Sequence, residues 1–140
     1  CLSSTGGTAI DYAVQAPGVY RAVGSYSGFP SVSDPDEMQD ISLTLGGGGA
    51  SAEAMWGPLG GPLWVAHDPT KNVAKLKGVA VYAAASGGPQ GDVDRLPPGF
   101  GNNFAGGLIE GKVADSTKRF ADAANAARLA RLAMAFARSR

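Results

Sequence analysis

A serine that could act as a nucleophile lies among small residues at the start of the chain. Residues 1–7 read Cys-Leu-Ser-Ser-Thr-Gly-Gly and run directly into a helical pattern. A serine at a sharp strand-to-helix turn is the arrangement of a nucleophile elbow, in which the turn exposes the hydroxyl and the helix start supplies backbone N–H groups. Ser3 is therefore a candidate nucleophile, and the backbone N–H of Ser4 is a candidate donor to an oxyanion.

The same residues also suit an ordinary helix cap. The usual elbow pattern is G-x-S-x-G, and here Cys1 and Thr5 stand where its two glycines would be. Serine is common at helix starts. On the motif alone, Ser3 is open to both interpretations.

The elements that would position these residues alternate between helix and strand. Cap-plus-proline pairs, Asp34-Pro35 and Asp68-Pro69, predict two of the helix starts. The alternation predicts an α/β fold with parallel strands, but two strands are fewer than a typical sheet has, so we expect part of the domain to be missing. The expected elements are helices at 9–16, 34–45 and from 104 onward, short helical turns at 51–56 and 73–76, strands at 20–26 and 79–85, and a Gly/Pro-rich loop at 86–103.

Composition and charge exclude several classes of protein. The 140 residues suffice for one domain, and 12 basic residues balance 12 acidic ones, which argues against a nucleic-acid-binding domain. A single cysteine excludes an internal disulfide and a cysteine-based zinc cluster. The sequence has no run of 18 apolar residues, so it predicts no transmembrane helix. The chain starts at Cys1 and shows no signal peptide, so we expect a truncated start.

Other candidate residues have simpler interpretations beside the functional ones. His67 is the only histidine and hence the only candidate base for Ser3 within the chain, but its place before Asp68-Pro69 favours a loop or helix-start residue. Trp56 and Trp64 could line an acyl or sugar pocket, or fill a core. The acidic residues at 34–40 have the spacing of a solvated helix start, and the sequence predicts no metal site.

Several further stretches carry a family resemblance. They are Pro17–Phe29, Met55–Pro58 (Met-Trp-Gly-Pro), Asp68–Leu76, Val81-Tyr82, Leu108–Gly111 (Leu-Ile-Glu-Gly) and Phe120–Ala126. In this order they resemble the mycolyltransferase (antigen 85) family of esterase D-like α/β hydrolases. That family has an elbow variant, G-x-S-M-x-G, and Gly6 falls on its late glycine. Cys1 departs from its first glycine and Ser4 from its methionine, whose contribution is a backbone N–H.

The resemblance implies a partial α/β-hydrolase fold, formed by the second half of the parallel sheet with flanking helices. It implies Ser3 as the nucleophile and Glu110 as the acid, in the chain order Ser, Glu, His. The family's histidine stands in a His-Ser-Trp stretch that this sequence lacks. We expect residues 1–126 to be the C-terminal part of such a domain. Residues 127–140 form an atypical Ala/Arg-rich tail that we expect to be helical, either an abnormal chain end or a basic amphipathic helix for membranes.

The resemblance also implies a reaction. It implies a serine acyltransferase that moves a fatty or mycolic acyl group from a trehalose ester to a sugar or glycolipid hydroxyl, through an acyl-serine, without cofactor or metal. The implied partners are an acyl-trehalose or other lipid ester and a sugar or glycolipid acceptor, and the implied location is secreted or cell-wall. We expect the chain to be inactive alone. A carboxylesterase of the esterase D type and a non-catalytic envelope-binding relative are the alternatives.

Overall fold

A three-stranded parallel sheet lies at the base of the computed structural model, which describes residues 1–87, 104–130 and 132–137. The strands are β1 (Ala22–Tyr26), β2 (Ala80–Ser86) and β3 (Leu132–Ala137), in the order β1-β2-β3. Leu2 adds a single parallel bridge to Tyr26, so the chain start lies along the outer edge of β1. The carboxyl ends of all these segments therefore meet at one edge of the sheet, where ligands of open α/β sheets bind.

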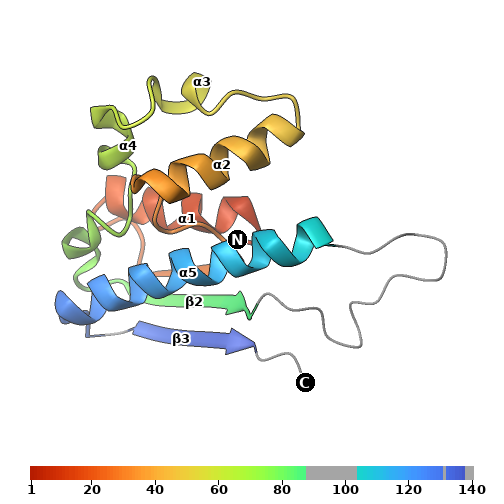
Figure 1. The fold of residues 1–140 in the computed structure, drawn as a ribbon. Helices are drawn as coiled ribbons and strands as arrows, with labels where there is room; N and C mark the ends of the chain where they lie inside the picture. The colour runs from red at the N-terminus through yellow and green to blue at the C-terminus, as the bar shows by residue number, and fades with distance from the viewer. Residues whose placement is uncertain (88–103, 131, 138–140) are drawn as a thin grey trace.

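Two long helices cover one face of this sheet (Figure 1). The helix α1 (Ser4–Gln15) contacts β1, and α5 (Phe104–Ala126) contacts β2. Ile10 of α1, Phe120 of α5 and Val81 of β2 meet in one buried cluster. Along β2, alternate residues are buried and half-buried, as expected when helices cover only one face. Among the described residues, no helix covers the second face (Figure 1).

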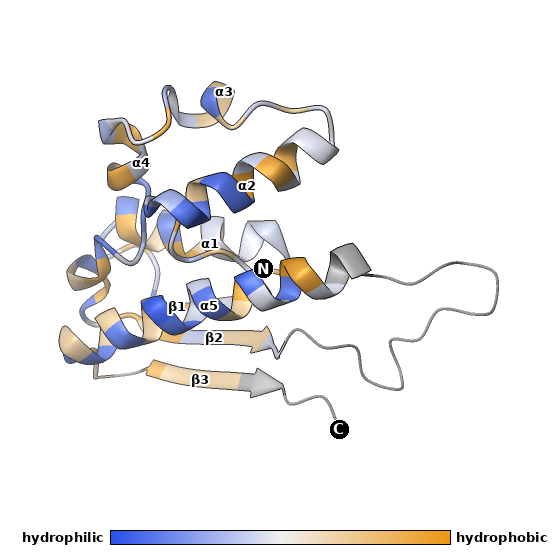
Figure 2. Ribbon diagram, viewed as in Figure 1, coloured by the Kyte–Doolittle hydropathy of each residue, from blue (hydrophilic) through white to orange (hydrophobic). Residues whose placement is uncertain are grey.

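A second layer of shorter elements packs over α1 and α5. It consists of α2 (Pro35–Gly47), α3 (Glu53–Trp56) and α4 (Pro62–Ala66), whereas the 3₁₀ turn η1 (Val73–Leu76) packs with α1 and α5 in the first cluster. Trp64, fully buried, joins Phe29, Ile41 and Val113 in a second apolar cluster beneath α2. Figure 2 shows β2 and β3 in apolar colours, whereas polar and apolar stretches alternate along α2 and α5.

Asp68 fastens this layer to the rest of the chain. Its buried side chain accepts hydrogen bonds from the backbone N–H groups of Thr70 and Lys71, which closes a local turn. The helix start predicted at Asp68-Pro69 is wrong, because the next helical element, η1, begins at Val73 after Asn72. Its other oxygen accepts from the N–H groups of Val32 and Ser33 and from the Ser33 hydroxyl. One carboxylate thus ties the start of α2 to the segment between α4 and η1.

Of the acidic residues at the start of α2, Asp36 is solvated as the spacing predicts, but Glu37 is not. Glu37 is only 4% exposed, and Arg119 of α5 lies 3.4 Å from it and 3.2 Å from Asp36. Burial raises the pKa of the Glu37 carboxyl, although a hydrogen bond from Ser31 and the charge of Arg119 oppose the shift. Charge pairing with α5 therefore draws this face of α2 inward.

The predicted helical tail is wrong: residues 132–137 form β3, which pairs with the outer edge of β2. Alanine and arginine favour helices, but pairing with an open strand edge outweighs such weak preferences. The alternation of Leu132, Met134 and Phe136 with alanines is the strand signal that the prediction overlooked. The short helix α4 was also not predicted. The predicted loop at 86–103 falls almost wholly outside the described residues.

Candidate active site

Ser3 occupies a sharp turn between the strand-like chain start and α1. Its backbone N–H donates to the Tyr26 carbonyl at 2.7 Å, and the Tyr26 N–H donates to the Cys1 carbonyl at 3.0 Å, which holds the chain in register with β1. Ser3 then adopts φ 59° and ψ −146°, a backbone region that is almost restricted to glycine. Its side chain is exposed and makes no capping hydrogen bond to α1. The structure therefore shows the strained turn that an elbow requires and not the capping contact of the simpler interpretation.

Glycines allow α1 to approach the end of β1 closely enough to form this turn. A Cβ on Gly7 would lie 2.1 Å from the Phe29 carbonyl oxygen, and a Cβ on Gly6 would lie 2.6 Å from the Ser25 Oγ. From the opposite side, a Cβ on Gly28 would lie 2.4 Å from the Gly7 nitrogen. Real Cβ atoms essentially never come so close, so no larger residue fits without a shift. Gly7 and Gly28 meet backbone atoms that cannot turn away, whereas the nearest atom to Gly6, the late glycine of the elbow variant, is the Ser25 hydroxyl, which can rotate. Packing therefore restricts Gly6 less strictly than the other two glycines.

Ser4 is the first residue of α1, next to the candidate nucleophile. The first N–H groups of a helix have no acceptor within it and face the positive end of the helix dipole. The backbone N–H of Ser4 is therefore placed where it could donate to an oxyanion formed at Ser3.

Glu110 lies in the second turn of α5, at the same edge of the sheet as Ser3. This follows from the topology, because α5 starts beyond the carboxyl end of β2 and runs back across it (Figure 1). The Glu110 side chain is half-buried, and its Oε2 is buried without a hydrogen-bond partner among the described residues. Among the described residues, no hydrogen bond or ion pair joins Ser3 and Glu110 directly. A buried carboxylate oxygen without a partner is costly, which leaves Glu110 ready to accept a hydrogen bond.

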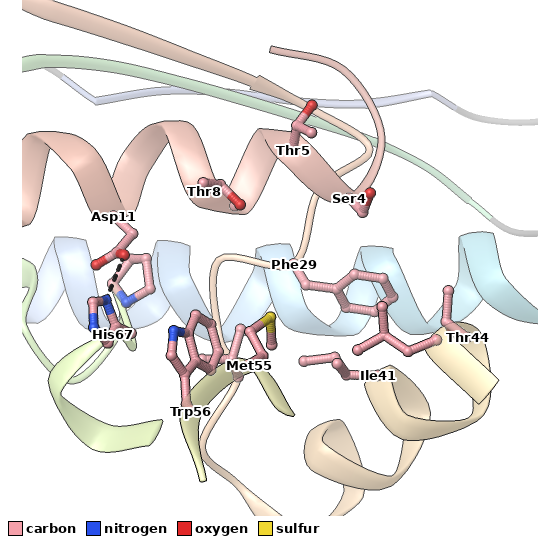
Figure 3. A pocket seen from close by; sticks show the side chains of 14 residues that line it. Ser4, Thr5, Thr8, Asp11, Phe29, Ile41, Thr44, Met55, Trp56 and His67 are labelled. Carbon is pink, nitrogen blue, oxygen red and sulfur yellow. Dashed lines mark hydrogen bonds and ion pairs between the residues drawn. The ribbon is translucent and has the colours of Figure 1, made fainter. Parts of the chain in front are cut away.

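A cavity of about 200 Å³ opens beside α1, between that helix and the α2–α4 layer (Figure 3). Trp56 lines this cavity, whereas Trp64 is wholly buried and serves the core. The wall is mainly apolar and carries a polar stripe from α1. Its principal lining residues are Ser4, Thr8, Asp11, Phe29, Val32, Ile41, Leu45, Met55, Trp56 and His67.

His67 pairs with Asp11 and not with Ser3. Its Nδ1 lies 2.8 Å from the Asp11 Oδ2, and its ring stacks on Trp56 with 1° between the planes. It directly follows α4, in keeping with the loop interpretation, yet it lines the cavity. The sequence analysis missed Asp11, because it lies 56 residues from His67. Ser4, Thr8 and Asp11 are spaced so that all three lie on one face of a helix. That spacing was the signal that could have placed Asp11 in the cavity.

The described residues show neither a metal site nor a membrane-spanning helix. No group of three or more His, Cys, Asp or Glu side chains converges among them. None of the helices in this part of the chain has the length and apolar character needed to cross a bilayer.

Comparisons with known proteins identify the family and the fold. The sequence model of a protein family described as "Putative esterase" matches residues 2–98. The diacylglycerol acyltransferase/mycolyltransferase Ag85A of Mycobacterium leprae is 34% identical over 128 residues, which are 89% of this chain and 37% of that protein. Ag85B of Mycobacterium intracellulare is 30% identical over 129 residues, 90% of this chain and 37% of that protein. The structure of Mycobacterium tuberculosis MPT51 matches with a TM-score of 0.81 at 19% identity, covering 97% of this chain and 49% of the other.

The fold and these matches define an α/β-hydrolase-fold protein, which confirms the predicted partial fold. The chain belongs to this esterase family, and its relatives are mycolyltransferases of the antigen 85 type, as the resemblance indicated. It spans only 37% of the length of these curated relatives. These relatives carry the names of acyltransferases, and the matching family is described as an esterase family.

Proposed function

We propose that Ser3 is the nucleophile of a serine acyltransferase of the mycolyltransferase type. The observation that carries this proposal is the backbone of Ser3, a non-glycine residue held at φ 59° and ψ −146° between a strand end and α1. Strain of this kind persists only where the surroundings enforce it, and it gathers at functional sites. Here the close backbone packing at Gly7 and Gly28 supports the turn, and the Ser3 side chain stays exposed.

In the proposed reaction, a base takes the Ser3 hydroxyl proton as the Oγ attacks the carbonyl carbon of a lipid ester. The carbonyl oxygen becomes an oxyanion, which accepts a hydrogen bond from the Ser4 N–H. Collapse expels the donor's alcohol, which takes up the proton, and leaves an acyl-serine. An acceptor hydroxyl then repeats the sequence in reverse and carries the acyl group away.

The base and the acid come from two parts of the whole protein. His67 is engaged by Asp11, so we assign the base to a histidine outside this chain, in the His-Ser-Trp stretch of the family. Glu110 would orient that histidine. The unpartnered Oε2 of Glu110, at the same edge of the sheet as Ser3, supports this role, because a triad carboxylate must accept the Nδ1–H of the base.

The substrates we propose are an acyl-trehalose or other lipid ester as donor and a sugar or glycolipid hydroxyl as acceptor, in the cell envelope or outside the cell. The names of the relatives support a lipid acyl group. The cavity that Trp56 lines lies next to Ser4 and could hold part of such a substrate. This chemistry requires no cofactor and no metal.

A carboxylesterase is the second candidate, because the matching family is described as an esterase family. The two reactions share the acyl-serine and differ in whether a sugar hydroxyl or water accepts the acyl group. The ratio of transfer to hydrolysis in the presence of trehalose separates them.

A chimaera tests the proposal. Residues 1–126 would replace the matching segment of Mycobacterium leprae Ag85A, which supplies the remaining strands and a histidine. We expect acyl transfer that Ser3→Ala lowers by at least about 10³-fold, because a triad nucleophile has no substitute. Ser4→Ala is the matched control: it keeps the backbone N–H, so activity should stay within about tenfold of the parent.

A chimaera that folds, by circular dichroism, and remains equally active after Ser3→Ala would refute the proposal. If the chimaera does not fold, a smaller exchange of residues 1–8 alone tests the same turn. A folded exchange with no activity would favour the non-catalytic alternative.

A further inference from the structure

The cavity beside α1 has a polar end that the proposed reaction does not use. Asp11 and His67 form it, and both side chains line the cavity (Figure 3). We propose that this end binds the hydroxyl group of an amphiphilic alcohol through the His67 Nε2, with the alcohol's apolar body against Trp56 and its neighbours. The inference deepens the proposed function, since such an alcohol is chemically an acyl acceptor or leaving group, but binding itself does not require a reactive Ser3.

The Asp11 carboxylate determines which ring nitrogen of His67 carries the proton. Asp11 is 9% exposed, and its Oδ1 accepts a hydrogen bond from Gln15 at 2.9 Å while its Oδ2 lies 2.8 Å from the His67 Nδ1. A carboxylate can only accept, so the Nδ1 must be the donor. In the neutral ring, the Nε2 is then an acceptor. Among the described residues, the Nε2 has no hydrogen-bond partner.

Stacking holds the His67 ring in place before any ligand arrives. The rings of His67 and Trp56 are parallel to within 1°, with centroids 5.2 Å apart, and Trp64 supports Trp56 edge-on at 5.1 Å. Gln15 also donates to the Ala66 carbonyl at 2.7 Å, which ties α1 to the end of α4 next to His67. A fixed acceptor loses little entropy when a donor binds, so this end of the cavity is preorganised.

The remainder of the cavity sets the size and polarity of the ligand. An apolar cavity of about 150 Å³ can hold benzene, and this one is about 200 Å³. Phe29, Ile41, Leu45 and Met55 form an apolar wall, which favours a hydrocarbon body. The ligand is therefore an alcohol of roughly eight heavy atoms, or that portion of a larger molecule.

The single histidine makes a direct test possible, because every imidazole signal of the 140-residue chain belongs to His67. The probes are 1-octanol and 1-methoxyheptane, which have the same number of heavy atoms, although only the alcohol can donate a hydrogen bond. At about pH 8, 1-octanol should shift the ¹⁵N resonance of the Nε2 saturably. The ether should bind about tenfold more weakly, because it has no hydroxyl proton to donate to the Nε2.

Variants separate this contact from general apolar binding. In His67→Phe, we expect the preference for the alcohol over the ether to vanish, as read from the Trp fluorescence, while Tyr12→Phe, which removes an exposed hydroxyl of α1, should leave the preference unchanged. Ser3→Ala should bind both probes as the parent does, so failure of the acyltransferase proposal would not affect this result. Equal affinities for the two probes, tighter binding of octanoate, or no saturable shift at His67 would overturn the inference. If His67→Phe does not fold, the two-probe comparison on the unaltered chain decides alone.

Discussion

Substituting Gly7 by alanine tests whether close packing of α1 produces the turn at Ser3. The new Cβ would lie 2.1 Å from the Phe29 carbonyl oxygen and 2.7 Å from the Phe29 carbonyl carbon. Both are backbone atoms, so neither can turn away as a flexible side chain could, and α1 must move. Overpacking costs up to about 3 kcal/mol, and the better helix propensity of alanine returns about 1 kcal/mol. We therefore expect a loss of roughly 2 kcal/mol in the free energy of unfolding.

Urea unfolding measures this loss. With a typical m value of about 2 kcal/mol/M, the midpoint should fall by roughly 1 M. Gly111→Ala is the matched control: Gly111 also lies within a helix, α5, but nothing stands within 4 Å of its Cβ position. The free energy of unfolding of that variant should rise by about 0.5–1 kcal/mol. If Gly7→Ala were as stable as the unaltered chain, α1 would not be packed against Phe29 as described, and the packing explanation of the turn would be refuted.

Three further substitutions test other parts of the account. Ser3→Gly should raise the free energy of unfolding by roughly 1 kcal/mol, because it relieves a strained backbone, and thermal unfolding that shows a loss would contradict the strain. Asp68→Ala removes the acceptor of four backbone N–H groups and one serine hydroxyl and should cost about 3 kcal/mol or more, whereas Asp122→Ala, at the exposed ion pair with Lys118, should leave the free energy of unfolding nearly unchanged. The pKa of Glu37 is raised above 4.5, so the folded chain holds that proton more tightly and its contribution to the free energy of unfolding falls as pH rises from 4.5. Glu37→Gln should make the measured pH slope less negative in that window, and an unchanged slope would show that the carboxyl is not perturbed.

Much of the fold follows from local sequence signals. Asp34-Pro35 correctly marks the start of α2, and the apolar run at 79–85 predicts β2 to within one residue at each end. These elements form where caps, prolines and periodicity all indicate the same structure. The strand β3 was missed because its alanines favour a helix locally, and only the edge of β2, far away in sequence, supplies its hydrogen bonds.

In the candidate site too, local features could be predicted from the sequence and long-range contacts could not. The turn at Ser3 could be predicted, because small residues and a helix start lie next to one another in sequence. The pairing of Asp11 with His67 could not, since these residues meet only after α1 and α4 pack. The burial of Glu37 has the same origin, because Arg119 reaches it only from α5. Contacts between distant elements depend on tertiary packing, which residue patterns do not encode locally.

The most direct test of the central claim is to find which residue carries the acyl group. The chimaera with Mycobacterium leprae Ag85A would be mixed with a lipid ester, quenched in acid, digested and analysed by peptide mass spectrometry. The account predicts an acyl ester on Ser3 that disappears in Ser3→Ala and persists in Ser4→Ala. An acyl group on another residue, or turnover without any acyl-serine, would contradict it.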